Sequence, residues 1–425
     1  MLTLKQTQQL NQLLDTVNEL TAGSISAWDQ ELAKEVQTVV AQIERATVAA
    51  HQASLVQQIA QTFDQQEQAL SNPMELPLRA LRHLVESGNL GETQKAQLLI
   101  QLGKTHDVLT QWEIALDQFY RALDYCQDDL PTKAEILKSI GHINSKQRDY
   151  RASNRLYRES LAIYSERQIP HQVAHIYICI GWNEFQSDNY PLAEANYHRA
   201  LQIATPLEGA ERLIADVNMN LAILATVRGE FETAISSYKQ GVAAYLSIDD
   251  ERGLAQSHYN MGLLYVDMQA WQQAGESYQK SLEYAQRQSN LHLIGHIHLS
   301  YTELALKLSD LALAHACCMH AVRSFGRMGS QSQLADAYKY AGQIQHRRRN
   351  WNNAERFFEK SIQLAQACES RLNQAEAHYE YGMMLMDKPD KDQAKTQLNE
   401  ALHLFTALGA KVDTQNTQTA LAQLA

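Results

Sequence analysis

Proline and glycine are scarce in this sequence, and it contains no long apolar run. Only 7 of its 425 residues are proline and 18 are glycine, which excludes a collagen-like chain and a Pro/Gly-rich disordered chain. No run of about 18 apolar residues occurs, so we expect no transmembrane helix. The N-terminus also lacks an apolar stretch of signal-peptide length. These absences predict that no membrane is a partner.

Paired cysteines and an excess of positive charge are also missing. The 5 cysteines are odd in number and form no C-x-x-C pair, so we expect free thiols in the cytoplasm. The net charge of −11 argues against nucleic acid as a partner. Motifs of catalysis and phosphate binding, such as G-x-x-x-x-G-K-[ST], G-x-S-x-G and H-E-x-x-H, are absent. We therefore expect neither an enzyme nor a bound cofactor.

What the sequence does contain is an internal repeat of 38 to 42 residues. Each repeat has a small residue that serves as its anchor. The eight anchors are Gly103, Gly141, Gly181, Ala222, Gly262, Ser300, Gly342 and Gly382.

Further columns keep the same register. Alanine prevails 7 residues before the anchor and 12 after it, and aromatic residues prevail 9 and 16 after it. Steps of four residues from +12 to +16 to +20 follow one face of an α-helix, and turn residues separate this face from the one before the anchor. Each repeat is therefore predicted to be a helix, a tight turn and a second helix.

This pattern resembles the tetratricopeptide repeat (TPR), most clearly in residues 257–285 and 176–201. The period near 40 is similar to that of the longer repeats in kinesin light chains, spindle-orientation adaptors and bacterial Rap and MalT-type sensors. The resemblance implies an all-α fold, a right-handed α-solenoid of about eight helix-turn-helix repeats with an N-terminal helical segment. We expect helices in residues 1–91 as a bundle or cap, with a degenerate repeat as an alternative for part of them. Eight repeats follow in 92–405 and a capping helix in 406–425.

The resemblance also implies which residues face a concave groove. In TPR proteins the first-helix positions −6, −3, +1, +4 and +5 relative to the anchor face inward. Apolar and aromatic residues fill many of these positions in repeats three to six, and such a strip typically binds a partner. The alternative is that some of them are buried between repeats. The candidate partner-binding residues are Ile178, Trp182, Phe185, Met219, Ile223, Tyr259, Leu263 and Tyr301.

Two polar clusters admit two readings each. Arg347, Arg348 and Arg349 could contact an anion, or could be cations that favour a helix C-terminus. His292 and His296 have the i, i+4 spacing of metal ligands. His296 also falls in the −4 column, however, where histidine recurs in two other repeats, so we expect it to pack and no metal to bind.

The sequence thus predicts a non-catalytic adaptor whose groove binds a peptide or an amphipathic helix of another protein. The alternative is a Rap-like regulatory sensor, whose N-terminal helices act on a partner under control of a peptide bound by the repeats. Neither the identity of the partner nor the oligomeric state follows from the sequence.

Overall fold

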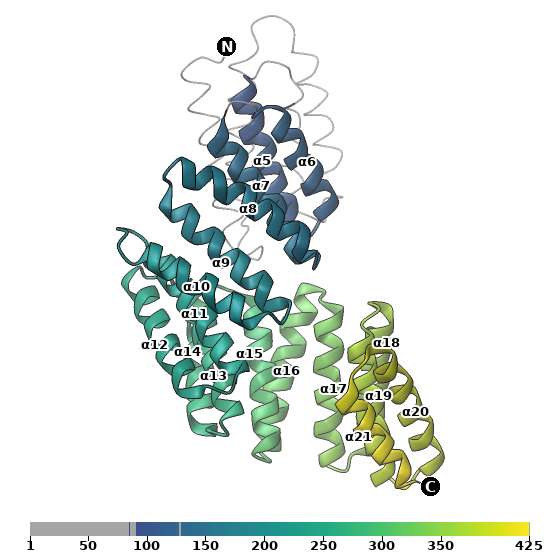
Figure 1. The fold of residues 1–425 in the computed structure, drawn as a ribbon. Coiled ribbons are helices and arrows are strands. Elements are labelled where there is room, and N and C mark those ends of the chain that lie inside the picture. Colours follow the sequence, from purple (N-terminus) through teal and green to yellow (C-terminus); the bar gives the residue numbers. More distant parts are fainter. Residues whose placement is uncertain (1–84, 86–90, 127–128, 425) are drawn as a thin grey trace, which may run out of the picture. The chain divides into compact units, whose positions relative to one another are not determined.

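The structure is a computed structural model that describes residues 85, 91–126 and 129–424. Within these ranges the chain forms α-helices and no strand, which confirms the all-α class (Figure 1). The helices expected within residues 1–91 lie outside the described residues, apart from Val85 and Gly91.

The helices come in pairs. The first helices of the eight pairs are α5 (Glu92–Val108), α7 (Leu130–Lys146), α9 (Pro170–Gln186), α11 (Glu211–Val227), α13 (Glu251–Asp267), α15 (Leu291–Lys307), α17 (Gln331–Arg347) and α19 (Arg371–Asp387). The second helices are α6 (Trp112–Asp124), α8 (Tyr150–Glu166), α10 (Tyr190–Ala204), α12 (Phe231–Ser247), α14 (Trp271–Arg287), α16 (Leu311–Met328), α18 (Trp351–Ala367) and α20 (Lys391–Leu408). A final helix, α21, spans Lys411–Ala422.

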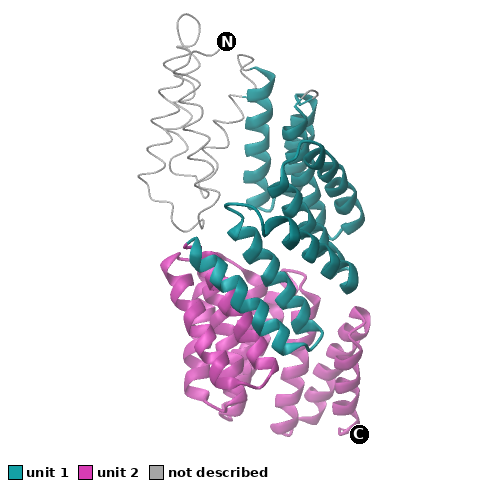
Figure 2. Cartoon of the chain, turned by 60° about the vertical axis from the view of Figure 1, so that its left-hand side comes forward, with its two compact units in different colours: residues 1–248 teal, residues 249–425 magenta. Residues whose placement is uncertain are grey.

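The chain divides into two compact units, residues 1–248 and 249–425 (Figure 2). The first contains α5 to α12 and the second α13 to α21. In each unit a first helix packs against the second helix of its own pair, and successive pairs stack on one another. Each unit is therefore an α-solenoid, as the repeat predicts.

Close packing between the anchor and the +16 column joins the two helices of a pair. A Cβ atom added to Gly181 would come within 2.6 Å of the Tyr197 ring, so only glycine leaves room for that ring. A hydrogen bond supplements this contact in three repeats, where the serine 19 residues after the anchor donates its Oγ hydrogen to the −7 carbonyl at 2.7 Å. These serines are Ser160, Ser281 and Ser361.

The turn inside each pair has one backbone geometry throughout. The residue 7 after the anchor is left-handed, for example Arg148 with φ 64° and Arg349 with φ 57°. The next amide, as in Asp149 and Asn350, donates to the carbonyl five residues earlier at 2.9 Å. This Schellman arrangement satisfies carbonyls at the helix end and reverses the chain.

The structure corrects the register of the sixth repeat. Every first helix has 17 residues and reaches 5 past its anchor, so α15 places Thr302 at the anchor instead of Ser300. Thr302 is fully buried, and the +16 position becomes Cys318, which is fully buried as well. The missing ring is supplied by Phe325, which packs on Gly295. Both residues lie 7 positions from their usual columns, Phe325 later in α16 and Gly295 earlier in α15. Because the two helices are antiparallel, a shift toward the end of α16 and an equal shift toward the start of α15 keep Phe325 opposite Gly295.

Helix α21 packs on α20 at the end of the second unit. Thr417 and Ala420 are buried on one side of it. Gln415, Asn416 and Gln418 are exposed and give this last helix a polar outer face, which suits the end of a solenoid.

Candidate functional site

A cavity of about 840 Å³ lies in the second unit, among α15, α17 and α19. Its volume is within the range of about 300–1,000 Å³ that is common for ligand pockets. Charged, aromatic and apolar side chains share the lining: Glu303, Leu306, Lys307, Tyr340, Gln343, His346, Arg347, Arg349, Trp351, Tyr379, Glu380, Met383 and Asp387.

The lining comes from equivalent positions of three successive repeats. Once α15 is in its corrected register, Glu303, Gln343 and Met383 all occupy position +1, and Lys307 and Arg347 both occupy +5. These are positions that the TPR resemblance assigns to the inward face. When the sixth repeat is anchored on Ser300, the α15 residues of the lining do not fall at inward-facing positions. The 40-residue steps from Trp271 through Leu311 to Trp351 are the signal that identifies them.

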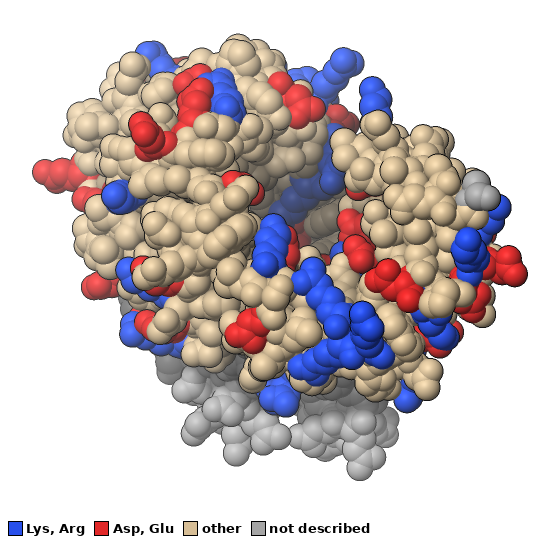
Figure 3. Space-filling model, turned by 90° about the horizontal axis from the view of Figure 1, so that it is seen from below, with Lys and Arg blue, Asp and Glu red and all other residues tan. Residues whose placement is uncertain are grey.

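An ion pair and a hydrogen bond hold several side chains of the lining. Lys307 Nζ lies 3.0 Å from Glu303 Oε1, one turn away on α15. His346 Nε2 on α17 lies 2.8 Å from Asp387 Oδ2 on α19. The His346 ring also lies against Trp351, with the ring centroids 5.8 Å apart. Figure 3 shows one face of the molecule, on which both basic (blue) and acidic (red) side chains occur.

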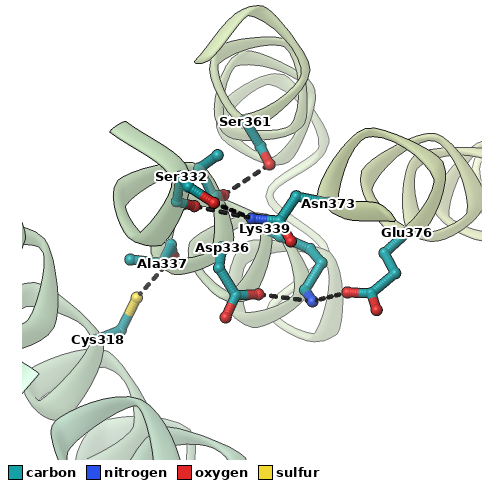
Figure 4. A network of polar contacts seen from close by, with 9 residues as sticks. Cys318, Ser332, Asp336, Ala337, Lys339, Ser361, Asn373 and Glu376 are labelled. Carbon is teal, nitrogen blue, oxygen red and sulfur yellow. Dashed lines mark hydrogen bonds and ion pairs between the residues drawn. The ribbon is translucent and has the colours of Figure 1, made fainter. Parts of the chain in front are cut away.

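The wall between α17 and α19 contains a buried lysine. Lys339 reaches between Asp336 on its own helix and Glu376 on α19 (Figure 4). Its Nζ lies 2.7 Å from Asp336 Oδ1 and 5.0 Å from the ring centroid of Tyr340, which lines the cavity. Burial lowers the pKa of Lys339, but the two carboxylates outweigh burial and raise it above the usual value. The lysine therefore stays charged and ties α17 to α19.

Glu380 lies in the same lining and is half-buried. Burial raises the pKa of its carboxyl group above the usual value, while a hydrogen bond from Gln343 and the charge of Lys339 oppose that shift. The cavity therefore presents a partly desolvated acid beside a side-chain amide.

The three arginines of the basic run take different positions. Arg347 and Arg349 line the cavity, and Arg348 does not. Arg347 Nη1 donates to the Leu306 carbonyl at 2.5 Å, and Arg348 Nη2 donates to the Leu311 carbonyl at 2.8 Å. The first helix of the seventh repeat ends at Arg347, so the run also lies at a helix C-terminus.

In the first unit, the predicted strip residues differ in exposure. Trp182 is 39% exposed, and its ring stacks on Phe185 with the centroids 5.7 Å apart. Ile223 is half-buried. Ile178 and Met219 are buried, at 9% and 6% exposure, so they contribute mainly to packing between repeats.

In the second unit, Leu263 is 39% exposed and Tyr259 is half-buried. The Tyr259 hydroxyl shares a hydrogen bond with Ser300 Oγ at 3.2 Å. Tyr301 differs from the expectation, because the corrected register moves it to position −1. Its hydroxyl donates to the Gly275 carbonyl of α14 at 2.7 Å, so this side chain packs between helices.

The histidines also follow the corrected register. The −4 packing position belongs to His298, whereas His296 lies against Phe325 with the ring centroids 5.3 Å apart. Burial and His320 lower the pKa of His298 to about 4. His292 and His296 are in ring contact at 4.5 Å. Across the described ranges no group of three or more potential ligands is placed to hold a metal ion.

Comparison with known proteins identifies the fold. No protein-family model matches the sequence, and no curated protein does either. Among solved structures, a STAND signal-transduction ATPase with a tetratricopeptide repeat sensor from Pyrococcus horikoshii matches with a TM-score of 0.61 at 15% identity, over 92% of this chain and 55% of that one. The apo quorum sensor NprR from B. thuringiensis matches with a TM-score of 0.55 at 13% identity, over 84% and 98%. A Rap protein complexed with competence and sporulation factor matches with a TM-score of 0.53 at 14% identity, over 85% and 99%.

These similarities establish that the chain has a TPR-type helical repeat fold resembling that of Rap-type proteins. None of the described helices is long and apolar enough to cross a membrane.

Proposed function

We propose that this protein is a non-catalytic scaffold that binds a peptide of another protein in the cavity formed by α15, α17 and α19. The observation that carries the proposal is the cavity itself, because three successive first helices line it with the columns that face inward in TPR proteins. Its solved neighbours include a Rap protein complexed with competence and sporulation factor and a Rap conjugation gene regulator in complex with the Phr* peptide.

The lining suits a short peptide. Tyr340, Trp351 and Tyr379 offer aromatic surface for apolar side chains. Gln343 offers a carbonyl and an amide group, which can pair with a peptide backbone. The exposed residues Trp182 and Leu263 offer further apolar contacts, each within its own unit.

A Rap-like regulatory role is the second candidate. The similarity to the quorum sensor and the Rap proteins covers about 84–85% of this chain, a larger share than the eight repeats make up. In this version the bound peptide controls an action of the N-terminal segment. Removing residues 1–91 would leave partner capture intact in a simple adaptor, and would abolish the regulated activity in a sensor.

The location that fits the proposal is the cytoplasm. All 5 cysteines are free thiols in the structure. Free thiols in this number suit a reducing compartment.

The test is a binding screen of the full-length protein against an array of random hexapeptides. Met383→Trp, which places an indole in the cavity, should abolish capture of the selected peptides. Met383→Leu is the matched control and should retain it, because leucine nearly conserves the volume. Equal melting temperatures would show that both variants fold. An array with no selective binder, or a Met383→Trp variant that binds as wild type does, would contradict the proposal.

A further inference from the structure

We propose that the cavity of the second unit selects an acidic peptide, whose carboxylate is bound between the guanidinium groups of Arg347 and Arg349. This inference rests on the proposed function and specifies its ligand. The carboxylate can belong to an aspartate or glutamate side chain or to the C-terminus of the peptide. An apolar side chain next to it would contact Trp351 and Met383.

The first argument is the distribution of charge in the lining. Lys307 is paired with Glu303, and His346 is hydrogen-bonded to Asp387, so both side chains already have a partner. Arg347 and Arg349 differ, since no carboxylate among the described residues lies within ion-pair distance of either. Two guanidinium groups that lack an ion-pair partner of their own favour an anionic ligand.

The second argument is that Arg347 is fixed in place. Its Nη1 donates to the Leu306 carbonyl at 2.5 Å, and that carbonyl lies in the last turn of α15. A cation is stabilised at this end of a helix by the aligned peptide dipoles. A guanidinium group has five N–H donors, so the remaining donors can form the fork that fits a carboxylate. This hydrogen bond reduces the side-chain entropy that Arg347 would lose on binding.

The third argument is the position of Arg349 in the turn. Helix α17 has ended, and Arg349 has a left-handed backbone with φ 57° while its amide donates to the His346 carbonyl at 2.8 Å. Arg347 thus lines the cavity from the last turn of the helix, and Arg349 lines it from the loop that follows. Arg348, between them, donates to the Leu311 carbonyl and is not in the lining.

The fourth argument concerns which anion fits. Glu303, Glu380 and Asp387 also line the cavity. A dianion such as phosphate would be repelled by these acids, and the raised pKa of Glu380 shows that burial already disfavours negative charge at that point. A singly charged carboxylate needs only the two guanidinium groups and brings less charge near the acids. The lining therefore favours a carboxylate over a phosphate.

The experiment measures fluorescence anisotropy with full-length protein and labelled hexapeptides. The peptides have the core Ala-Asp-Phe-Leu or Ala-Asn-Phe-Leu, and each is made with a C-terminal amide and with a free C-terminal carboxylate. Higher affinity for aspartate than for asparagine in the amide series identifies a side-chain carboxylate. Higher affinity for the free C-terminus than for the amide, in the asparagine series, identifies the peptide terminus.

The arginine variants are the decisive arm. Arg347→Gln and Arg349→Gln should each weaken binding of the charged peptide by about 10-fold or more, as expected for the loss of a hydrogen bond between charged groups. Arg348→Gln is the matched control and should bind as wild type does. Arg347→Lys should give an intermediate loss, because lysine keeps the charge and loses the fork.

The possible failures can be told apart. Peptides that bind the cavity without preferring a carboxylate would overturn this inference and leave the scaffold proposal standing. Equal losses in Arg347→Gln and Arg348→Gln would also overturn it, since the effect would then be one of general charge. No binding of any peptide would overturn both proposals. Melting temperatures of all variants, measured in parallel, exclude unfolding as the cause of a loss.

Discussion

Gly262 and Tyr278 pack so closely that a Cβ atom on Gly262 would come within 2.3 Å of Tyr278 Cε1. The ring cannot move aside, because Tyr278 is 1% exposed and is held against Tyr301 at a centroid distance of 5.3 Å. The contact between the anchor and the +16 column is therefore a steric requirement of the helix pair.

Gly262→Ala should destabilise the second unit by about 1–3 kcal/mol, because the added methyl group overpacks the pair. Gly275→Ala is the matched control in the partner helix. No atom lies within 4 Å of the Cβ that it would add, so the better helix propensity of alanine should raise stability by about 1 kcal/mol. Urea unfolding followed by circular dichroism measures both changes. A stable Gly262→Ala protein would show that the ring yields.

The second prediction compares two lysines at the same repeat position. Lys138 and Lys339 both stand 3 residues before their anchors. Burial lowers the pKa of Lys138, which donates to Gln172 at 2.9 Å. Lys339 keeps a raised pKa through Asp336 and Glu376, although burial opposes it.

Lys339→Met should therefore cost about 3–5 kcal/mol, because it leaves two carboxylates close together without their cation. Lys138→Met should change stability by about 1 kcal/mol or less, since it removes one hydrogen bond to a neutral side-chain amide but also removes a desolvated charge. The measurement is urea unfolding at neutral pH. Equal losses in the two variants would refute the role of the two carboxylates.

The third prediction concerns acid stability. His298 has a pKa lowered to about 4 by burial and by His320, and its Nδ1 is buried without a hydrogen-bond partner among the described residues. The unfolded chain therefore binds more protons than the folded one between the ordinary pKa of about 6.5 and pH 4, and stability falls as the pH falls through that window.

His298→Leu should flatten this part of the pH profile, because leucine does not titrate. Leu99 and Leu137 occupy the same repeat position and are buried there. The exposed His403 provides the control, and His403→Leu should leave the profile as it is. Thermal unfolding at several pH values from 4 to 7 measures the difference. An unchanged slope in His298→Leu would show that another group is responsible.

The fourth prediction concerns Glu380. Its pKa is raised by burial, so the folded protein binds more protons than the unfolded chain above the ordinary carboxyl pKa, and stability falls as the pH rises through that range. Glu380→Gln should raise the melting temperature at neutral pH and reduce this dependence. Glu400, which is exposed on α20, is the matched control, and Glu400→Gln should change neither. A lower melting temperature in Glu380→Gln would show that the charge is stabilising.

The fifth prediction separates binding from folding at Trp182. Trp182 is 39% exposed, so Trp182→Ala should lower the stability of the fold less than Ala274→Leu does, because the leucine adds volume at a fully buried position. If the exposed ring contacts the partner, its loss should weaken binding by about 2 kcal/mol, or roughly thirtyfold. Unfolding by Trp182→Ala would instead make it a core residue.

Much of the fold can be predicted from the sequence, because the close contacts between paired helices restrict the residue type at fixed repeat positions. Glycine beside a ring, as at Gly141 and Tyr157, recurs at fixed spacing since each pair must approach closely. The sixth repeat is an exception to this spacing. Its ring and glycine, Phe325 and Gly295, both lie two helical turns from the usual columns, so the small residue Ser300 resembles an anchor although Thr302 occupies that position.

The candidate site was harder to predict for two reasons. Glu303 and Lys307 line the cavity, but they fall at inward-facing repeat positions only when Thr302, and not Ser300, is taken as the anchor of α15. In addition, a repeat pattern gives the face of a residue but not its contacts. It could not show that Arg347 and Arg349 line one cavity while Arg348, between them, donates to Leu311.

The left-handed turns have a practical consequence for the design of heat-resistant variants. Gln269 and Ser309 adopt that conformation at the position where the fourth repeat has Gly229. A side chain costs about 1–2 kcal/mol in this conformation, so glycine at either turn removes strain without touching core or cavity. The seventh turn differs, because Arg349 holds the same strained backbone and its side chain lines the cavity. Glycine at this turn would also relax the backbone but would remove a guanidinium group from the cavity, so the seventh turn is the one to leave unchanged when the others are rebuilt.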